Sequence, residues 1–344
     1  MRILFDAMSG DNAPLANLQG ARMAADQFSD LSITLVGKES ELKELAAKEN
    51  ISLADLEILD APDVISMEDD PTSILKTKKE SSMAVGFQAL AAGKGDAFVT
   101  AGNTGAFVAG ATLIVKRLSG IKRPALAPIL PCKGGFYQLL DVGANAVCRP
   151  EMLVQFGLMG SIYMNKLMGV KEPRVGLVNI GVEEHKGTPL QQEAYSMMQA
   201  QTNYHFIGNA EARDIPLGVC DVAVCDGFTG NVVLKTTEGF SKMLLGNLKE
   251  AIYSSLKSKI GGLLIKNNLD GMKKSLDYKE HGGAVLLGVK APCIKAHGSS
   301  DGKAFFSAIR QARKVVQEGV IPAIEAGLAE IAAKEKEASP EENA

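Results

Sequence analysis

Residues 97–110 have the sequence AFVTAGNTGAFVAG. An apolar, β-prone run at 97–99 leads into a polar loop at 100–105, and an apolar stretch with helical character follows. This order of strand, small polar loop and helix is typical of the repeating unit of a parallel α/β sheet.

The same unit occurs at four other places along the chain. Apolar runs at 3–5, 138–140, 175–178 and 222–225 each end in a loop rich in Gly, Asn and Asp. Further strand candidates are 33–37 and 204–208. Strands that alternate with helices predict an α/β fold, a doubly wound and largely parallel sheet with helices on both faces. We expect residues 1–333 to form a single α/β catalytic domain.

The loops that follow these strands are expected to form one crevice. In a parallel sheet the carboxyl ends of all strands share an edge, and ligands of open α/β sheets bind there. Any one of the loops could be a simple turn, because Gly, Asn and Asp are common turn residues. Five polar loops at one edge favour a binding site instead.

Composition excludes several classes of protein. Of the 344 residues, 46% are hydrophobic and 22% are charged, and the net charge is −3, so neither a disordered chain nor a nucleic-acid-binding surface is indicated. The 5 cysteines form no C-x-x-C pair, which favours a reducing cytoplasm over a disulfide framework. The uncharged stretch 97–115 has a polar centre that would break an apolar helix, so we expect a soluble protein.

The common motifs of cofactor and metal enzymes are absent from the sequence. There is no G-x-x-x-x-G-K-[ST], no G-x-G-x-x-G after a strand, no H-E-x-x-H and no G-x-S-x-G. We therefore expect no cofactor and no metal.

The residue types in the expected crevice suit a small anion such as phosphate. Backbone N–H groups at helix N-termini and short neutral side chains can cradle it. The candidates for this cradle are Asn103, Thr104, Gly105, Gly230 and Asn231.

Two further residues could supply charge or a proton. Lys186 is the most credible cation, although a lysine that opens a helix can equally be an ordinary surface residue. His297 stands at the end of a predicted strand, where a structural histidine is as reasonable as a functional one.

The segment 240–280 is Lys-rich, amphipathic and helical. We expect a protruding helical hairpin with its tip at the apolar residues 260–265, and a docking surface at Lys257, Lys259, Lys273 and Lys274. The hairpin could contact an acidic partner, an anionic membrane or, at its tip, a second subunit. After it we expect return strands at 282–288 and 294–298, a closing helix at 302–333 and a frayed acidic tail at 334–344.

The polar loops together resemble those of the PlsX family, in sequence and in order. The motifs that carry the resemblance are 6–14 (DAMSGDNAP), 101–106 (AGNTGA), 139–145 (LLDVGAN), 179–181 with 186–187 (NIG and KG), 211–214 (EARD), 226–232 (DGFTGNV) and 296–299 (AHGS). This family is the bacterial phosphate acyltransferase of phospholipid synthesis, which makes acyl phosphate from acyl carrier protein thioesters and inorganic phosphate. The sequence departs from the family at Ser9, where a glycine is usual.

The resemblance implies a fold similar to that of isocitrate and isopropylmalate dehydrogenases. It also implies a homodimer, with acyl carrier protein and inorganic phosphate as substrates. The protein would be cytoplasmic and peripherally associated with the inner face of the cell membrane, where the downstream glycerol-3-phosphate acyltransferase is a candidate partner.

The implied mechanism is a direct attack of phosphate on the thioester, without a covalent enzyme intermediate. Lys186, Asn103, Thr104 and Asn231 would stabilise phosphate or the oxyanion, with Gly105 and Gly230 beside them, and His297 would orient phosphate or donate a proton. Residues that order the loops or contact substrate would be Asp6, Asp141, Asn145, Arg213 and Asp226.

Other functions stay open at this point. A coenzyme A-dependent phosphate acyltransferase of related fold would share the crevice. A decarboxylating dehydrogenase would need clustered aspartates for a divalent metal. A non-catalytic adaptor for the carrier protein or the membrane would use the hairpin alone, and would leave the five polar loops unexplained.

Overall fold

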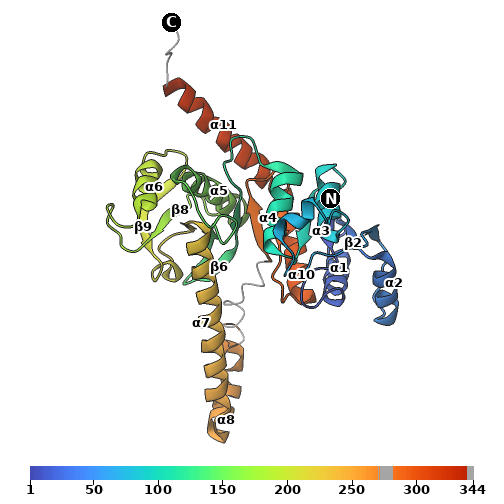
Figure 1. Ribbon diagram of the computed structural model, residues 1–344. Coiled ribbons are helices and arrows are strands. Elements are labelled where there is room, and N and C mark those ends of the chain that lie inside the picture. The colour runs from blue at the N-terminus through green and yellow to red at the C-terminus, as the bar shows by residue number, and fades with distance from the viewer. Residues whose placement is uncertain (270, 272–281, 339–344) are drawn as a thin grey trace.

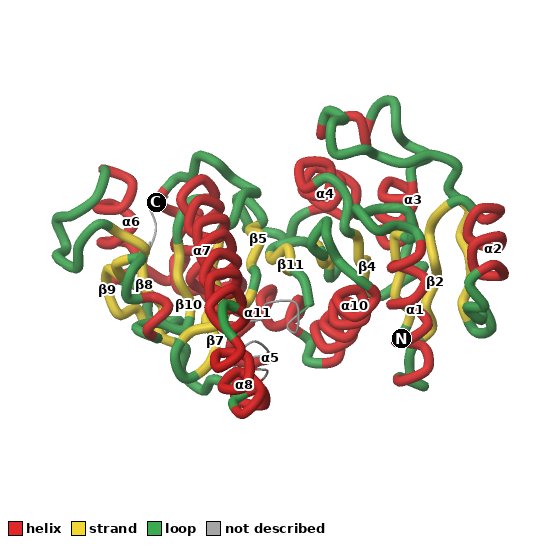
Figure 2. Tube along the Cα trace, turned by 90° about the horizontal axis from the view of Figure 1, so that it is seen from below, coloured by secondary structure: helices red, strands yellow, loops and turns green. Residues whose placement is uncertain are grey.

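The computed structural model describes residues 1–269, 271 and 282–338. Its strands form two sheets that lie side by side, with helices on their faces (Figures 1 and 2). The predicted α/β class with largely parallel strands is confirmed.

The first sheet has seven strands in the order β3-β2-β1-β4-β12-β11-β5. Parallel pairing joins β3 through to β12, and β11 runs antiparallel to both of its neighbours. The bounds are β1 Arg2–Asp6, β2 Ser32–Gly37, β3 Leu56–Asp60, β4 Ala97–Thr100, β5 Ala125–Ala127, β11 Ala284–Leu287 and β12 Cys293–Lys295.

The second sheet has five strands in the order β6-β7-β10-β8-β9. All pairs are parallel except β6 with β7. The bounds are β6 Ile129–Cys132, β7 Gly135–Leu140, β8 Arg174–Asn179, β9 His205–Glu211 and β10 Val222–Val224.

Pro128 marks the passage from one sheet to the other. The single apolar run around it divides into β5, which pairs with β11, and β6, which pairs with β7. A proline has no N–H for a strand ladder, so the run cannot continue through it as one central strand. The polar loops therefore lie on the edges of two sheets, which the strand pattern alone did not predict.

Alternating side chains of each strand face helices on opposite sides. In β1, Ile3 and Phe5 belong to the cluster that includes Phe305, and Leu4 belongs to the cluster of Phe87. The first cluster extends into the second sheet, so the two sheets share one apolar core. The helices and short helical turns are α1 Leu15–Gln27, α2 Glu39–Lys48, η1 Pro71–Leu75, α3 Ser82–Ala91, α4 Thr104–Gly110, the π-helix η2 Ala111–Lys116, α5 Pro150–Met168, α6 Pro189–Gln199 and η3 Ile215–Leu217.

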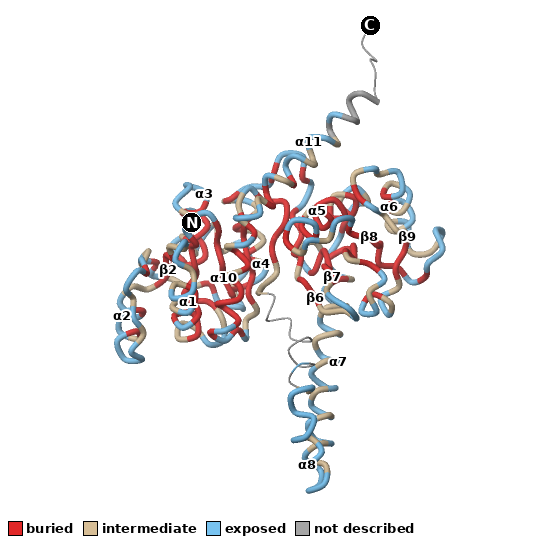
Figure 3. Tube along the Cα trace, turned by 180° about the vertical axis from the view of Figure 1, so that it is seen from behind, coloured by how far each residue is buried: buried red, intermediate tan, exposed pale blue. Residues whose placement is uncertain are grey.

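A helical hairpin protrudes from the body, as expected (Figures 1 and 3). Its first helix, α7, spans Gly227–Tyr253, and α8 spans Leu256–Leu264. The expected tip at 260–265 is wrong, because Ser255 caps α8 and the chain turns before it. The apolar residues 260–264 lie within α8, where Gly262 faces Ile252 of α7. Lys273 and Lys274 lie outside the described residues.

The hairpin leaves many apolar side chains at the surface. Leu256, Leu263 and Leu264 are 78%, 73% and 81% exposed, and no residue of α8 is buried. Exposed apolar groups of this number are unusual on a surface that faces only water. No helix among the described residues is both long enough and apolar enough to cross a membrane.

The C-terminal segment begins as expected but is broken once. Helix α10 spans Gly302–Gln317, and α11 spans Val320–Ala338. Gly319 lies between them with φ of +61°, a conformation that favours glycine and ends the first helix. The single closing helix is therefore wrong, and α11 extends into the first residues of the expected tail; residues 339–344 lie outside the described residues.

Candidate functional site

A cavity of about 240 Å³ lies between the carboxyl edges of the two sheets, and we call it the central cavity. Its apolar lining residues include Leu126, Pro128, Ile129, Leu130, Val142 and Leu234. Its polar lining residues include Thr104, Asn231, Lys235, Glu238, Lys295 and His297. Predicted site residues from both sheets, namely Thr104, Asn231 and His297, are thus brought together.

Asp6 orders the loop that follows β1. Its buried carboxylate accepts hydrogen bonds from Ser9 Oγ at 2.5 Å and from Thr100 Oγ1 at 2.7 Å, so it ties the ends of β1 and β4 together. The positive φ in this loop is at Gly10, at +112°, and not at Ser9. Serine therefore fits at this position without strain, and its hydroxyl has a buried partner.

The Asn103 side chain is fully engaged by the protein. Its Oδ1 accepts from the N–H of Ala106 at 3.0 Å and caps α4. Its Nδ2 donates to the carbonyl oxygens of Ser66, Met67 and Asp69 at 3.1–3.3 Å. Asn103 thus holds the segment 66–69 at the site, and Met67 of that segment lines the cavity.

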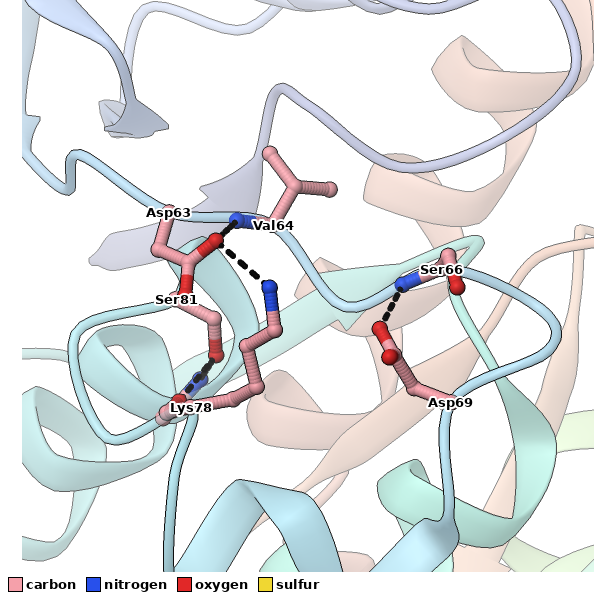
Figure 4. Close-up of polar contacts among 7 residues, drawn as sticks. Asp63, Val64, Ser66, Asp69, Lys78 and Ser81 are labelled. Atoms are coloured by element: carbon pink, nitrogen blue, oxygen red, sulfur yellow. Dashed lines mark hydrogen bonds and ion pairs between the residues drawn. The ribbon is translucent and has the colours of Figure 1, made fainter.

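The loop 61–81, which carries this segment, is held by its own polar contacts (Figure 4). Lys78 Nζ lies 2.9 Å from Asp63 Oδ1, and the N–H of Ser66 donates to Asp69 Oδ2 at 2.7 Å. The hydrogen bond from Lys78 lowers the pKa of Asp63. Gly105 faces this loop, because a Cβ there would lie 2.6 Å from a side-chain carbon of Pro71.

Asp141 links the two sheets. Its carboxylate accepts from the N–H of Leu126 in β5 at 2.9 Å, and from the backbone and side-chain amides of Asn145 at 2.6 and 3.0 Å. Asn145 Nδ2 also donates to the Pro124 carbonyl at 2.7 Å. Burial raises the pKa of Asp141 to about 6, against the lowering effect of these hydrogen bonds.

The first turn of α7 sits on the Asp141 loop. Asp226 caps the helix by accepting from the N–H and hydroxyl of Thr229, each at 2.8 Å. At Gly230, a Cβ would lie only 1.9 Å from the Asp141 carbonyl oxygen. The Gly230 N–H donates to the Asp226 carbonyl. Gly230 is therefore required by packing, and the next residue, Asn231, is the one that lines the cavity.

Lys186 and Arg213 also lie on this edge, and like Asn103, Gly105 and Gly230 they do not line the central cavity. The main chain of Lys186 is anchored by Asn179 Nδ2, which donates to its carbonyl at 3.1 Å, and its side chain is half-buried. Arg213 is exposed and forms ion pairs with Glu211 and Asp214 at 3.1 and 3.7 Å.

His297 has a defined ring orientation. The N–H of Ser299 donates to His297 Nδ1 at 3.1 Å, and the Ser299 hydroxyl lies 2.9 Å from the same atom. Because Nδ1 is an acceptor, the neutral ring carries its proton on Nε2. Sequence reasoning missed Lys295, two residues before His297, which also lines the cavity. A lysine as the last residue of an apolar strand on this edge was the available signal.

The cysteines are poorly suited to be nucleophiles. Burial raises the pKa of the Cys148 and Cys220 thiols to about 12, and it also raises the pKa of Cys225 and Cys293. None of the five lines the central cavity. Among the described residues, no group of three or more His, Cys, Asp or Glu could hold a metal ion.

The fold is thus an α/β fold of two sheets with a cavity between them. Solved structures with this fold include a phosphotransacetylase from Streptococcus pyogenes, with a TM-score of 0.60 and 16% identity over 95% of this chain and 94% of the other. A branched-chain phosphotransacylase from Enterococcus faecalis has a TM-score of 0.57 and 13% identity over 92% and 99%.

The family described as fatty acid synthesis protein matches residues 1–323. A phosphate acyltransferase from Clostridium tetani is 48% identical over 90% of this chain and 93% of its own length. One from Bacillus cytotoxicus is 47% identical over 94% and 97%. The chain therefore belongs to this family, the PlsX family of phosphate acyltransferases, as its loop motifs indicated.

Proposed function

We propose that this protein transfers the acyl group of an acyl carrier protein thioester to inorganic phosphate, forming acyl phosphate for glycerophospholipid synthesis. The observation that best supports the proposal is the central cavity, which is lined both by cationic, amide and hydroxyl groups and by apolar side chains. Phosphate needs the polar groups, and the first carbons of an acyl chain fit the apolar side chains.

The reaction requires positioning and charge stabilisation but no enzyme nucleophile. An oxygen of hydrogen phosphate attacks the thioester carbonyl carbon, a C–O bond forms, and the C–S bond breaks as the thiolate leaves. The proton of the phosphate hydroxyl ends on the thiol sulfur, so the equation balances without an oxidant or a metal. Holding phosphate beside the thioester and stabilising the oxyanion are the main catalytic tasks.

We assign these tasks to residues of both sheets. Thr104 and Asn231 contact phosphate or the oxyanion from the cavity wall. His297 Nε2–H orients phosphate or donates a proton to the leaving sulfur, and Lys186 adds positive charge from the loop after β8. A thiol with a usual pKa of about 8.5 needs little protonation to leave, so the histidine has the smaller effect.

The other predicted residues, apart from Arg213, position the residues that contact phosphate or the oxyanion. Asn103, Gly105 and Gly230 place the loops and helix starts rather than touching phosphate, because their polar or packing partners lie within the protein. Asp6, Asp141, Asn145 and Asp226 order the same loops through the hydrogen bonds described above. Arg213 at the end of β9 contacts substrate outside the cavity.

The hairpin supports a docking role. Lys257 and Lys259 on α8 lie beside exposed leucines, which suits an acidic carrier protein or an anionic membrane surface. We propose a homodimer in the cytoplasm that contacts the inner face of the cell membrane peripherally, near the glycerol-3-phosphate acyltransferase that uses its product.

The assay that tests the proposal measures acyl phosphate formed from a long-chain acyl carrier protein and inorganic phosphate, with no added metal. Acyl-coenzyme A serves as a parallel donor. Product from the carrier-bound donor is the expected result. Product from acyl-coenzyme A alone would overturn the assigned donor, and no product from either donor would overturn the activity.

A further inference from the structure

Lys295 is a buried cation that the assignment above does not use. It ends β12 in the interior of the first sheet, next to β4, and it is only 9% exposed. Its Nζ donates to the carbonyl oxygens of Ala101 at 3.0 Å and Ala296 at 2.7 Å. These two contacts fix the ammonium group at the end of the strand, where the residue lines the central cavity.

The burial of this ammonium is not balanced by an ion pair. Among the described residues, no carboxylate oxygen lies within 4.0 Å of Lys295 Nζ, and both of its acceptors are neutral carbonyls. An ammonium group has three donors, so one N–H remains beyond the two carbonyl bonds. A buried ammonium group with an unused N–H donor is unfavourable unless an anion balances its charge and accepts that hydrogen bond.

The charged and titratable groups around Lys295 come from three elements. Asp6 and Asp11, from β1 and the loop after it, favour its charged form, and Lys235 of α7 opposes it. Glu238 pairs with Lys235 at 2.8 Å, and His297 lies two residues after Lys295. Burial, the largest influence, and Lys235 lower the pKa of Lys295 to about 8, against the raising effect of Asp6 and Asp11.

We propose that the Lys295 ammonium binds phosphate directly in the central cavity, through the N–H that its two carbonyl partners leave. The proposal rests on the proposed function, since it makes inorganic phosphate the ligand of this cavity. Thr104, Asn231 and His297 line the same cavity and supply neutral donors around the anion. Lys295 keeps its protons throughout the reaction and acts as a fixed positive charge.

Phosphate binding can be measured without any acyl donor. Inorganic phosphate is titrated into the full-length protein by calorimetry, for wild type, Lys295→Met and the control Lys290→Met, whose lysine is exposed in the turn between β11 and β12. We expect phosphate to bind Lys295→Met at least about tenfold more weakly than wild type, and Lys290→Met to bind as wild type does. Unchanged phosphate affinity in folded Lys295→Met would overturn the proposal.

A second variant keeps the test valid if Lys295→Met does not fold. Lys295→Gln retains a donor for the carbonyls but carries no charge, and we expect the same loss of phosphate affinity. In turnover, the KM for phosphate should rise at least about tenfold in either variant, while the KM for the acyl donor changes less than about twofold. An equal rise in both KM values would indicate a structural role and overturn the proposal.

The pH profile gives an independent readout. Phosphate is already a dianion above pH 8, so a further fall in wild-type phosphate affinity between pH 8 and 9.5 reports the loss of the Lys295 charge. This fall should be absent in Lys295→Gln.

The failure of this proposal can be told apart from the failure of the proposed function. Phosphate binding that depends on Lys295, in a protein that forms no acyl phosphate, would refute the activity and support the phosphate site. Acyl phosphate formation with an unchanged KM for phosphate in Lys295→Gln would support the activity and overturn the role of Lys295 in phosphate binding.

Discussion

Helix α7 differs sharply between its first turn and its far end. At Gly230, a methyl group would meet the Asp141 carbonyl oxygen at 1.9 Å, whereas at Gly246 nothing lies within 4 Å. The first turn belongs to a region whose polar groups find partners inside the chain. The far end, with α8, has leucines that are exposed among the residues the structure describes. The comparison contrasts a region shaped by internal packing with one whose apolar side chains are exposed, and for the second we propose contacts with a partner.

The largest effect that tests this comparison is expected from Gly230→Ala. The added methyl group must push α7 away from the Asp141 loop, which should lower the free energy of unfolding by about 3 kcal/mol or more. The matched variant, Gly246→Ala in the same helix, should raise it by about 0.5–1 kcal/mol through helix propensity. Urea unfolding of both proteins measures the difference, and similar stabilities would remove the contrast between the two ends.

Lys186→Ala should affect chemistry rather than folding. Loss of its positive charge should lower the turnover number by about 100-fold. Because the Lys186 main chain, not its side chain, holds the loop, the free energy of unfolding should change by less than about 0.5 kcal/mol. Lys171→Ala, at an exposed position before β8, is the control for both measurements. An unchanged rate in the folded Lys186 variant would remove this residue from the mechanism.

Ser9→Ala sharpens the description of the packed region. It removes one of the hydroxyl donors of the buried Asp6 carboxylate and should destabilise the protein by about 1 kcal/mol. Ser29→Ala, at an exposed position, should be neutral in the same thermal unfolding experiment. Equal melting temperatures for the two variants would show that the Ser9 hydroxyl contributes nothing measurable.

The smallest effect on stability is expected in the hairpin. Lys257→Glu combined with Lys259→Glu should change the free energy of unfolding by less than about 0.5 kcal/mol, because both side chains are at the surface. The same variant should bind acyl carrier protein or anionic vesicles more weakly, and the wild-type binding should fall steeply with salt. Binding that responds neither to the charge reversal nor to salt would refute the docking role.

Local patterns predicted most of the strands and the loops that follow them, but they missed β3, β5 and β6. Apolar runs before Asp6, Thr100 and Asp226 became strands. Thr104 and His297 came together because β4 and β12 are parallel neighbours, and Asn231 faces the same cavity from the second sheet. The division into two sheets was not predictable in the same way. It depends on which strand pairs with β5 and which with β6, a long-range choice that Pro128 only marks.

Tertiary contacts decided what the sequence left open at the site. Asn103 and Gly230 have the composition of a phosphate cradle, but their partners are a loop and a carbonyl oxygen that lie far away in the chain. Lys295 was missed for a related reason, because a single lysine after an apolar strand becomes distinctive only when its burial is known. The hairpin turn was misplaced because two glycines looked more like a turn than Ser255, a helix cap.

The Asn103 side chain has a consequence for motion in this molecule. One amide group both caps α4 and holds the carbonyl oxygens of the segment 66–69. If that segment lifts away, the same side chain loses three acceptors and can rotate, which releases the N–H of Ala106. Loop opening and fraying of the first turn of α4 are therefore expected to be one event, and Ala106 should exchange its amide hydrogen at the rate at which the loop opens.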